Sequence, residues 1–243
     1  MIRVQSSGLA DNLAELTDIQ MRRLPVATAR ALTMTAYDVR ERLKAEMESV
    51  FDRPTRYTLN SLLVEPASRN RLEARVWMKD EASKGESATR WLTPEVYGGP
   101  RLQKRMERQL RERGILPAGK YVTPGAGAKL DAHGNISRGQ IAKAMSGIGG
   151  NTNVGYDANA TDSKRSRAKG NARRYFVMRR GGESIGIAER TSKGRGGIQI
   201  VLAFVSKPSY AKALRFFEVS DEFVAERLPA RFEEAMATEA KYN

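Results

Sequence analysis

The chain is organised around residues 173–217, the stretch with the clearest β-sheet pattern. Residues 175–178 are aromatic and β-branched, which suits a pleated, half-buried surface. A Gly-Gly pair at 181–182 can adopt the positive φ angles of a tight hairpin turn. Residues 184–188 then alternate in polarity, and residues 198–205 form an almost continuous apolar run, typical of a central strand covered on both faces. The pattern predicts an antiparallel meander of three strands.

Two amphipathic helices are expected to pack on this sheet. From Leu32 to Val50, apolar residues recur every three or four positions and so form one face of a long helix. Residues 218–243 form a second amphipathic helix, which Pro229 should kink or restart. Residues 59–65 and 72–78 are strand candidates that would extend the sheet. The fold class expected is therefore α+β, with an antiparallel sheet packed by a long N-terminal helix and a C-terminal helix.

The middle of the chain has a different character. Glycine and proline recur through residues 80–171, where only two short helices are expected, after Pro100 and after Ser137. Long irregular stretches are uncommon inside compact domains and often serve as arms that become ordered on a partner. We therefore expect three parts. Residues 1–79 form the first half of an α+β core, 80–171 a loop-rich insertion or arm, and 172–243 the second half of the core.

Composition restricts the cellular setting and the kind of partner. The 243 residues include no cysteine, which argues against disulfides and thiolate metal sites. No apolar run approaches the ~18 residues of a membrane-spanning helix. Asp11, Glu15 and Asp18 do not fit a secretory signal, so we expect a cytosolic chain. The net charge of +14 and pI near 10.2 favour an anionic partner, either nucleic acid or acidic protein.

The charge is unevenly distributed along the sequence. Residues 101–113 carry a net +4 and residues 161–175 a net +5, whereas residues 218–243 carry a net −4. Copies of such a chain could attract each other head to tail. The basic stretches could equally contact phosphates, or form a solvated loop that keeps the protein soluble. The candidate residues for contact with DNA or a partner are Arg101, Lys104, Arg105, Arg108, Lys164, Arg165, Arg167, Lys169, Arg173 and Arg174.

The sequence matches to catalytic motifs lack the structural context that those motifs require. Residues 182–186 match G-x-S-x-G around Ser184, but that motif requires a strand, a sharp turn and a helix, whereas here a strand follows a hairpin turn. The single histidine, His133, lies in a distant glycine-rich loop. Residues 125–129 lack the Gly-Lys-Ser/Thr of a phosphate loop, and no His, Asp and Glu have metal-ligand spacing. We therefore expect no enzymatic activity, no cofactor and no metal site; a hydrolase is a remote alternative.

Two segments together resemble a family. The first is residues 29–47, with an Ala-Leu-x-x-Thr-Ala core. The second is YFVMRRGGESIGIAER (175–190), followed by IQIVLAFVSKPSYAKALRFF (198–217) and a closing amphipathic helix. Their order is similar to that of the minor tail, or tail-completion, proteins of tailed bacteriophages, of the lambda minor tail protein Z type. Shared features include a Phe-Val-x-Arg strand and Gly186, Ile187 and Arg190 of the next strand. The resemblance covers about half of the chain, and residues 80–171 depart from it.

The resemblance implies a structural rather than a catalytic role. It implies a ring-shaped homo-oligomer at the head–tail junction or upper tail, assembled in the bacterial host cytoplasm and retained in the virion. The partners it implies are neighbouring portal, connector or tail proteins, with non-specific contact to packaged DNA in the channel and none with a membrane. The alternative is a basic nucleic-acid-binding protein that is not part of a virion, and it rests on charge alone.

Overall fold

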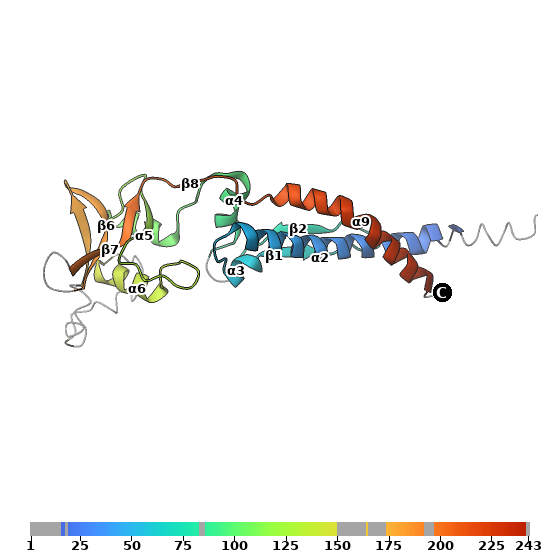
Figure 1. The fold of residues 1–243 in the computed structure, drawn as a ribbon, viewed down its shortest axis with the longest axis horizontal. Helices are drawn as coiled ribbons and strands as arrows, with labels where there is room; N and C mark the ends of the chain where they lie inside the picture. The colour runs from blue at the N-terminus through green and yellow to red at the C-terminus, as the bar shows by residue number, and fades with distance from the viewer. Residues whose placement is uncertain are drawn as a thin grey trace, which may run out of the picture. The chain divides into compact units, whose positions relative to one another are not determined.

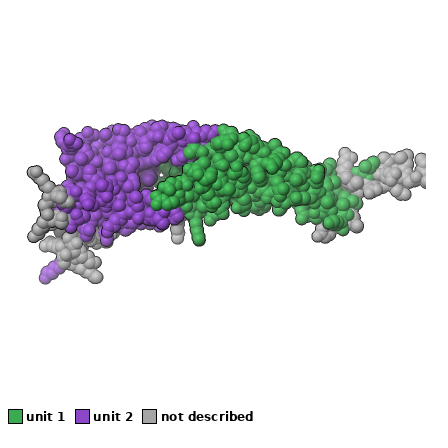
Figure 2. Space-filling view, in the orientation of Figure 1, with its two compact units in different colours: residues 1–92, 213–243 green, residues 93–212 purple. Residues whose placement is uncertain are grey.

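The chain divides into two compact units (Figure 2). Unit 1 consists of residues 1–92 and 213–243, and unit 2 of residues 93–212. Both contain helices and antiparallel strands, so the α+β class predicted from sequence is confirmed. The computed structural model describes residues 16–17, 19–82, 86–149, 164, 174–191 and 197–241.

Unit 1 is built on two long helices that lie side by side and antiparallel, α2 (Leu24–Val50) and α9 (Phe216–Lys241) (Figure 1). A short π-helix, η1 (Ile19–Arg23), precedes α2. Pro25 lies in the first turn of α2, where a backbone N–H would have no carbonyl partner within the helix. Small side chains of α2 let the helices approach closely. Ala27 and Ala31 pack on Ala235, flanked by Leu228, Phe232 and Met236 of α9.

Most of the apolar face predicted for α2 is buried, although Val50 at its end is exposed. Ala36, Val39, Leu43 and Met47 are all buried, and the opposite face is solvated. Beside α2 lies a small sheet of two antiparallel strands, β1 (Leu62–Glu65) and β2 (Arg75–Met78). These strands do not extend the meander, contrary to expectation, but form a sheet of their own. The α9 helix runs through Pro229 as one helix, so it does not restart there.

Unit 1 also contains α3 (Arg56–Leu59), whose N-cap Thr55 accepts a hydrogen bond from the Thr58 amide. The division between the units falls within α4 (Thr89–Tyr97).

Unit 2 contains a four-stranded antiparallel sheet in the order β4-β7-β6-β5. The three strands of the meander are where the sequence predicts them. Gly181 and Gly182 have φ angles of 57° and 85°, as the hairpin turn requires. Val201 and Leu202 are neighbours on β7, yet both are fully buried, because the centre of this strand is covered on both faces. The strands are β4 (Tyr121–Pro124), β5 (Tyr175–Arg180), β6 (Glu183–Arg190) and β7 (Ile198–Val205).

Helices α5 (Arg105–Glu112) and α6 (Arg138–Gly147) complete the core of unit 2. Leu110 of α5 and Met145 of α6 join Ile187 of β6 in one buried cluster. The N-cap predicted for α6 is confirmed, since the Ser137 side chain accepts a hydrogen bond from the Gln140 amide. A two-residue pair, β3 (Gly99–Pro100) and β8 (Ser209–Tyr210), completes the unit. Pro100 therefore lies in a strand, and the helix expected after it begins only at Arg105.

The predicted domain boundaries need correction. The sequence suggested one core made of residues 1–79 and 172–243, interrupted by an arm at 80–171; the boundaries fall instead at 92/93 and 212/213. Much of the expected arm is folded because β4 pairs with β7 and the apolar sides of α5 and α6 are buried in the same cluster as the meander. Residues 150–163 and 165–171 of the expected arm lie outside the described residues.

Close contact between strands makes Gly125 a sensitive position. Its amide donates to the Val201 carbonyl, and a Cβ atom there would lie 2.2 Å from the Ile200 carbonyl oxygen. We expect Gly125→Ala to lower the free energy of unfolding by about 1–3 kcal/mol, because the strands must separate to admit a methyl group. Gly139 is the control, since its Cβ would meet nothing within 4 Å in helix α6.

Urea unfolding followed by circular dichroism tests this expectation. Gly139→Ala should be neutral or stabilising by up to about 1 kcal/mol. Equal effects of the two substitutions would show that β7 is not tightly packed against residues 125–127.

Candidate functional site

The net positive charge of the chain comes from unit 2. Residues 93–212 contain 23 Lys and Arg against 8 Asp and Glu, a net charge of +15. Residues 1–92 and 213–243 contain 19 against 20, a net charge of −1. An anionic partner is therefore attracted mainly to unit 2.

One of the predicted phosphate-contacting residues has a different role. Arg101 is only 9 % exposed and forms a two-pronged ion pair with Glu107, which is fully buried. Glu107 also accepts hydrogen bonds from the amides of Lys104 and Val122, both at 2.7 Å. Arg101 donates to the Val122 carbonyl as well and lies 4.9 Å from the centre of the Tyr121 ring. Arg101 therefore joins α5 to β4 and is not available to DNA, which corrects the sequence prediction.

The pKa of Glu107 reflects this environment. Burial alone would raise it, but the hydrogen bonds from Arg101 and from two backbone amides hold the pKa of Glu107 below its ordinary value. The carboxylate is thus ionised in the folded protein, and it stabilises the fold at neutral pH.

Arg174, a second candidate, is also paired. Its Nε donates to Glu189, a residue only 3 % exposed, whose other oxygen accepts a hydrogen bond from Gln140 of α6 at 3.3 Å. Gln140 in turn accepts a hydrogen bond from the Lys129 amide. Burial and the neighbouring Glu189 carboxylate raise the pKa of Tyr175 to about 12. This network ties α6 to β6, so Arg174 has a structural role at this end of the sheet.

Three candidates of the first basic stretch stay exposed. Lys104, Arg105 and Arg108 lie at the start of α5 with exposed side chains, and so does Lys164 of the second stretch. The remaining candidates, Arg165, Arg167, Lys169 and Arg173, lie outside the described residues.

The sequence prediction missed another basic group, which we call the basic sheet end: Lys120, Arg179, Arg180 and Lys207. These residues are far apart in sequence and belong to neither basic stretch. Only the strand pairing of unit 2 brings them to one end of the sheet.

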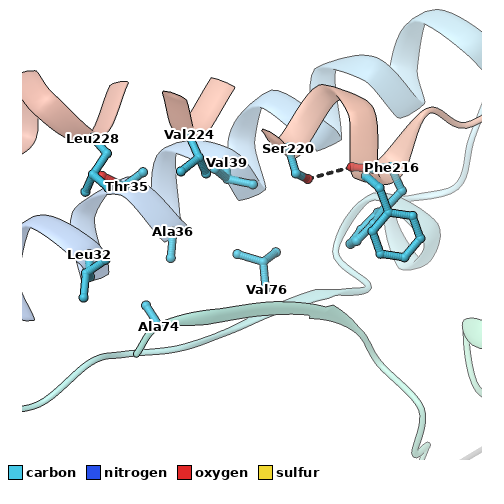
Figure 3. Close-up of a pocket in the computed structure, with 11 residues that line it drawn as sticks. Leu32, Thr35, Ala36, Val39, Ala74, Val76, Phe216, Ser220, Val224 and Leu228 are labelled. Carbon is cyan, nitrogen blue, oxygen red and sulfur yellow. Dashed lines mark hydrogen bonds between the residues drawn. The ribbon is translucent and has the colours of Figure 1, made fainter. Parts of the chain in front are cut away.

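Unit 1 contains an apolar groove between α2, β2 and α9, with a volume of about 290 Å³ (Figure 3). Ala74 and Val76 face the two helices across it. Thr35 of α2 lies in its wall and is 3 % exposed, and its hydroxyl has no hydrogen-bond partner in the described structure. The lining residues are Leu32, Thr35, Ala36, Val39, Ala74, Val76, Phe216, Phe217, Ser220, Val224 and Leu228.

Helix α9 also carries an acidic face, on the side of the helix opposite the residues that line the groove. Glu222, Glu226 and Glu233 are exposed and spaced four and seven residues apart, so they lie on one side of the helix. Glu222 binds Arg215 at 3.1 Å, while Glu226 and Glu233 have no ion-pair partner among the described residues.

A carboxylate between the long helices holds the groove's two walls in register. Asp38 of α2 accepts hydrogen bonds from Arg231 at 2.7 and 2.9 Å and from Arg227 at 3.2 Å, both on α9. The bonds from Arg231, joined by those from Arg227, keep the pKa of Asp38 below its ordinary value. Since a bidentate Arg–carboxylate pair also fixes orientation, it sets how α2 and α9 face each other.

The two residues considered for catalysis, Ser184 and His133, lie in a strand and in a turn. Ser184 is a buried residue of β6, as expected for a strand residue, and His133 lies in a turn where Asp131 accepts hydrogen bonds from the amides of His133 and Asn135. Within the described residues, no three His, Cys, Asp or Glu side chains gather as metal ligands. None of the helices in the described residues is long and apolar enough to span a bilayer.

Comparison of the chain with protein-family models, curated proteins and solved structures found no match. Its function is therefore inferred from its own residues and geometry, together with the resemblance of residues 29–47 and 175–217.

The buried pair gives a direct test of unit 2. Glu107→Gln should lower the free energy of unfolding by about 3–5 kcal/mol, because Arg101 would stay buried without its counter-charge. The exposed Glu112, on the same helix, is the control, and Glu112→Gln should change stability by no more than about 0.5 kcal/mol.

The pH dependence of this effect has a definite sign. The pKa of Glu107 is lower in the folded than in the unfolded state, where it is about 4.3. Its contribution is thus present above that pH and disappears as the pH falls through the folded-state pKa. Urea titrations should therefore show the difference between wild type and Glu107→Gln shrinking below about pH 4. A constant difference would mean that the pair does not govern stability.

Proposed function

We propose that the protein is a structural subunit of a tailed bacteriophage that assembles into a closed ring at the head–tail junction or upper tail. The resemblance of residues 29–47 and 175–217 to tail-completion proteins motivates this role. The observation that carries it is the presence, within one chain, of a unit with an apolar groove and an acidic helix face and of a second unit with a net charge of +15. Such a chain presents two unlike surfaces that complement each other.

The groove would receive unit 2 of a neighbouring copy. Charge complementarity supports this occupant, because unit 1 carries the acidic face of α9 and unit 2 is strongly basic. A contact between unlike surfaces is heterologous, and it closes into a ring when the rotation between copies permits. A partner group could also satisfy the buried Thr35 hydroxyl, whose lack of a hydrogen bond costs about 1–3 kcal/mol.

Apolar contact has to supply most of the affinity. Exposed ion pairs contribute at most about 1 kcal/mol each, so charge directs the register of the copies more than it holds them together. Burial of apolar area contributes about 25 cal/mol per Å². Phe217, which lines the groove and is 48 % exposed, is the largest side chain available for this contact in the wall of the groove.

A second candidate function is a nucleic-acid-binding protein that is not part of a virion. The charge of unit 2 favours it. The two functions differ in assembly without nucleic acid, since only the ring requires the chain to self-associate.

Sedimentation velocity and mass photometry of the purified full-length chain test the proposal. The ring model expects one discrete oligomer of fixed copy number that dissociates on dilution. A monomer at every concentration would contradict the proposal and favour the second candidate. Open-ended filaments would contradict closure.

The groove is tested by Phe217→Ala. If the Phe217 side chain becomes buried between copies, its removal should weaken association by about 1.5–3 kcal/mol, roughly 10- to 150-fold in the dissociation constant. Leu72 is a matched control, because it is 47 % exposed in unit 1 and does not line the groove. Equal weakening by Phe217→Ala and Leu72→Ala would rule out the groove as the contact.

The acidic face of α9 is tested by Glu226→Lys together with Glu233→Lys. The double reversal should weaken association most visibly at high dilution and low salt, because it replaces attraction to unit 2 by repulsion. Glu48→Lys with Glu81→Lys makes the same change of charge at exposed positions of unit 1 outside α9. The electrostatic part of the model fails if both double variants assemble like the wild type at low salt.

A further inference from the structure

Strand pairing brings three chain segments to one end of the unit 2 sheet. Tyr121, at the start of β4, pairs with Val205, at the end of β7. Arg180 and Glu183 pair across the β5–β6 turn. The Lys120 ammonium lies 3.9 Å from the Glu183 carboxylate, which shows that the start of β4 and the start of β6 reach the same end.

This end is rich in basic groups and poor in acidic ones. Arg179, Arg180 and Lys207 are exposed, and within the described residues none of them has an ion-pair partner. Among the residues that the structure describes, Lys120 has only its long pair with Glu183, whose side chain is 57 % exposed. Only one of the four cations is therefore paired with a carboxylate in the described structure, and that carboxylate is solvated.

The backbone beneath these side chains is well defined. Gly181 and Gly182 form a tight turn directly after Arg180. The Lys120 carbonyl accepts a hydrogen bond from Arg111 of α5 at 2.8 Å, which ties the entry of β4 to the helix. Cations on fixed backbone lose less freedom on binding than cations on a mobile loop.

The arrangement suits a polyanion with regularly spaced charges. Neighbouring strands lie about 4.8 Å apart, so the four strands from β5 to β4 spread the cations over roughly 14 Å. Duplex DNA carries one phosphate charge per about 1.7 Å of helix axis, so a surface of this width meets several phosphates. We propose that the basic sheet end is a binding surface for the phosphate backbone of double-stranded DNA, without recognition of sequence.

The surroundings favour nucleic acid over an acidic protein as the partner. Protein interfaces have an apolar centre rich in aromatic residues. None of the exposed large apolar side chains of the described residues lies in 117–121, 179–184 or 205–207. Backbone recognition of DNA needs positive charge and no such centre. This proposal does not depend on ring formation.

Fluorescence anisotropy with a labelled mixed-sequence duplex of about 30 base pairs tests the proposal on the full-length chain. The wild type should bind with an affinity that falls steeply between about 50 and 200 mM salt, and equally for unrelated sequences. The variant Arg179→Gln/Arg180→Gln/Lys207→Gln should reduce the slope of log K against log salt by about 3, which is close to one for each phosphate that is no longer neutralised. Arg179→Lys/Arg180→Lys should keep the slope, because the charge is retained.

The matched control removes three charges elsewhere in the same unit. Arg138 and Lys143 of α6 and Lys129, nine residues before that helix begins, are exposed. Helix α6 is tied through Gln140 to Glu189, at the opposite end of the sheet. Replacement of Lys129, Arg138 and Lys143 by Gln should leave most of the slope intact. Circular dichroism establishes that each variant is folded.

Three outcomes would overturn the proposal. One is the absence of binding by the folded wild type at about 50 mM salt. Another is an equal reduction of the slope in both triple variants, which would mean a diffuse attraction without a site. The third is displacement of the duplex by polyglutamate as readily as by unlabelled duplex at equal charge, which would assign the surface to an acidic protein. Because association is measured separately, a failure here leaves the ring proposal unaffected.

Discussion

The pairing of α2 with α9 is the constraint on which the architecture depends. It joins residues near the start of the described chain to residues near its end, through small side chains at Ala31 and Ala235 and through the Asp38 carboxylate held by Arg231 and Arg227. Once these helices are paired, residues 93–212 have to leave unit 1 and return to it. They form a unit with its own sheet and core. The same pairing leaves the groove open between α2, β2 and α9.

This division also separates two kinds of surface. The apolar groove and the acidic helix face belong to unit 1, whereas the surplus of positive charge belongs to unit 2. Within unit 2 the structure further separates structural from available cations. Arg101 and Arg174 form ion pairs with the carboxylates of Glu107 and Glu189, respectively. Arg179 and Arg180 are exposed to solvent at the hairpin. We therefore infer that the groove of unit 1 takes part in self-association, whereas the basic sheet end of unit 2 contacts DNA.

Local patterns in the sequence predicted most of the helices and strands, but they missed β4 and did not show which strands pair. The helix from 24 to 50, the hairpin at Gly181 and Gly182 and the cap at Ser137 follow from periodicity, backbone freedom and hydrogen-bonding capacity, which neighbouring residues decide. The prediction that the meander packs on the long helices was wrong. Its strand β7 instead pairs with β4, about eighty residues away in sequence, and local patterns do not show such pairing. The basic sheet end was missed for the same reason, since distant strand pairing brings its cations together. The buried role of Arg101 was missed because Val122 of β4, distant in sequence, completes the hydrogen bonding of its pair with Glu107.

Hydrogen exchange of the full-length chain tests the separation of roles most directly. The protein is compared at two concentrations, one on each side of its association midpoint, and with and without duplex DNA. We expect association to slow exchange in peptides from 216–228, which border the groove. We expect DNA to slow exchange in peptides from 175–190, which contain the hairpin of the basic sheet end. Protection of the α9 peptides by DNA, with no change in the hairpin, would contradict the account.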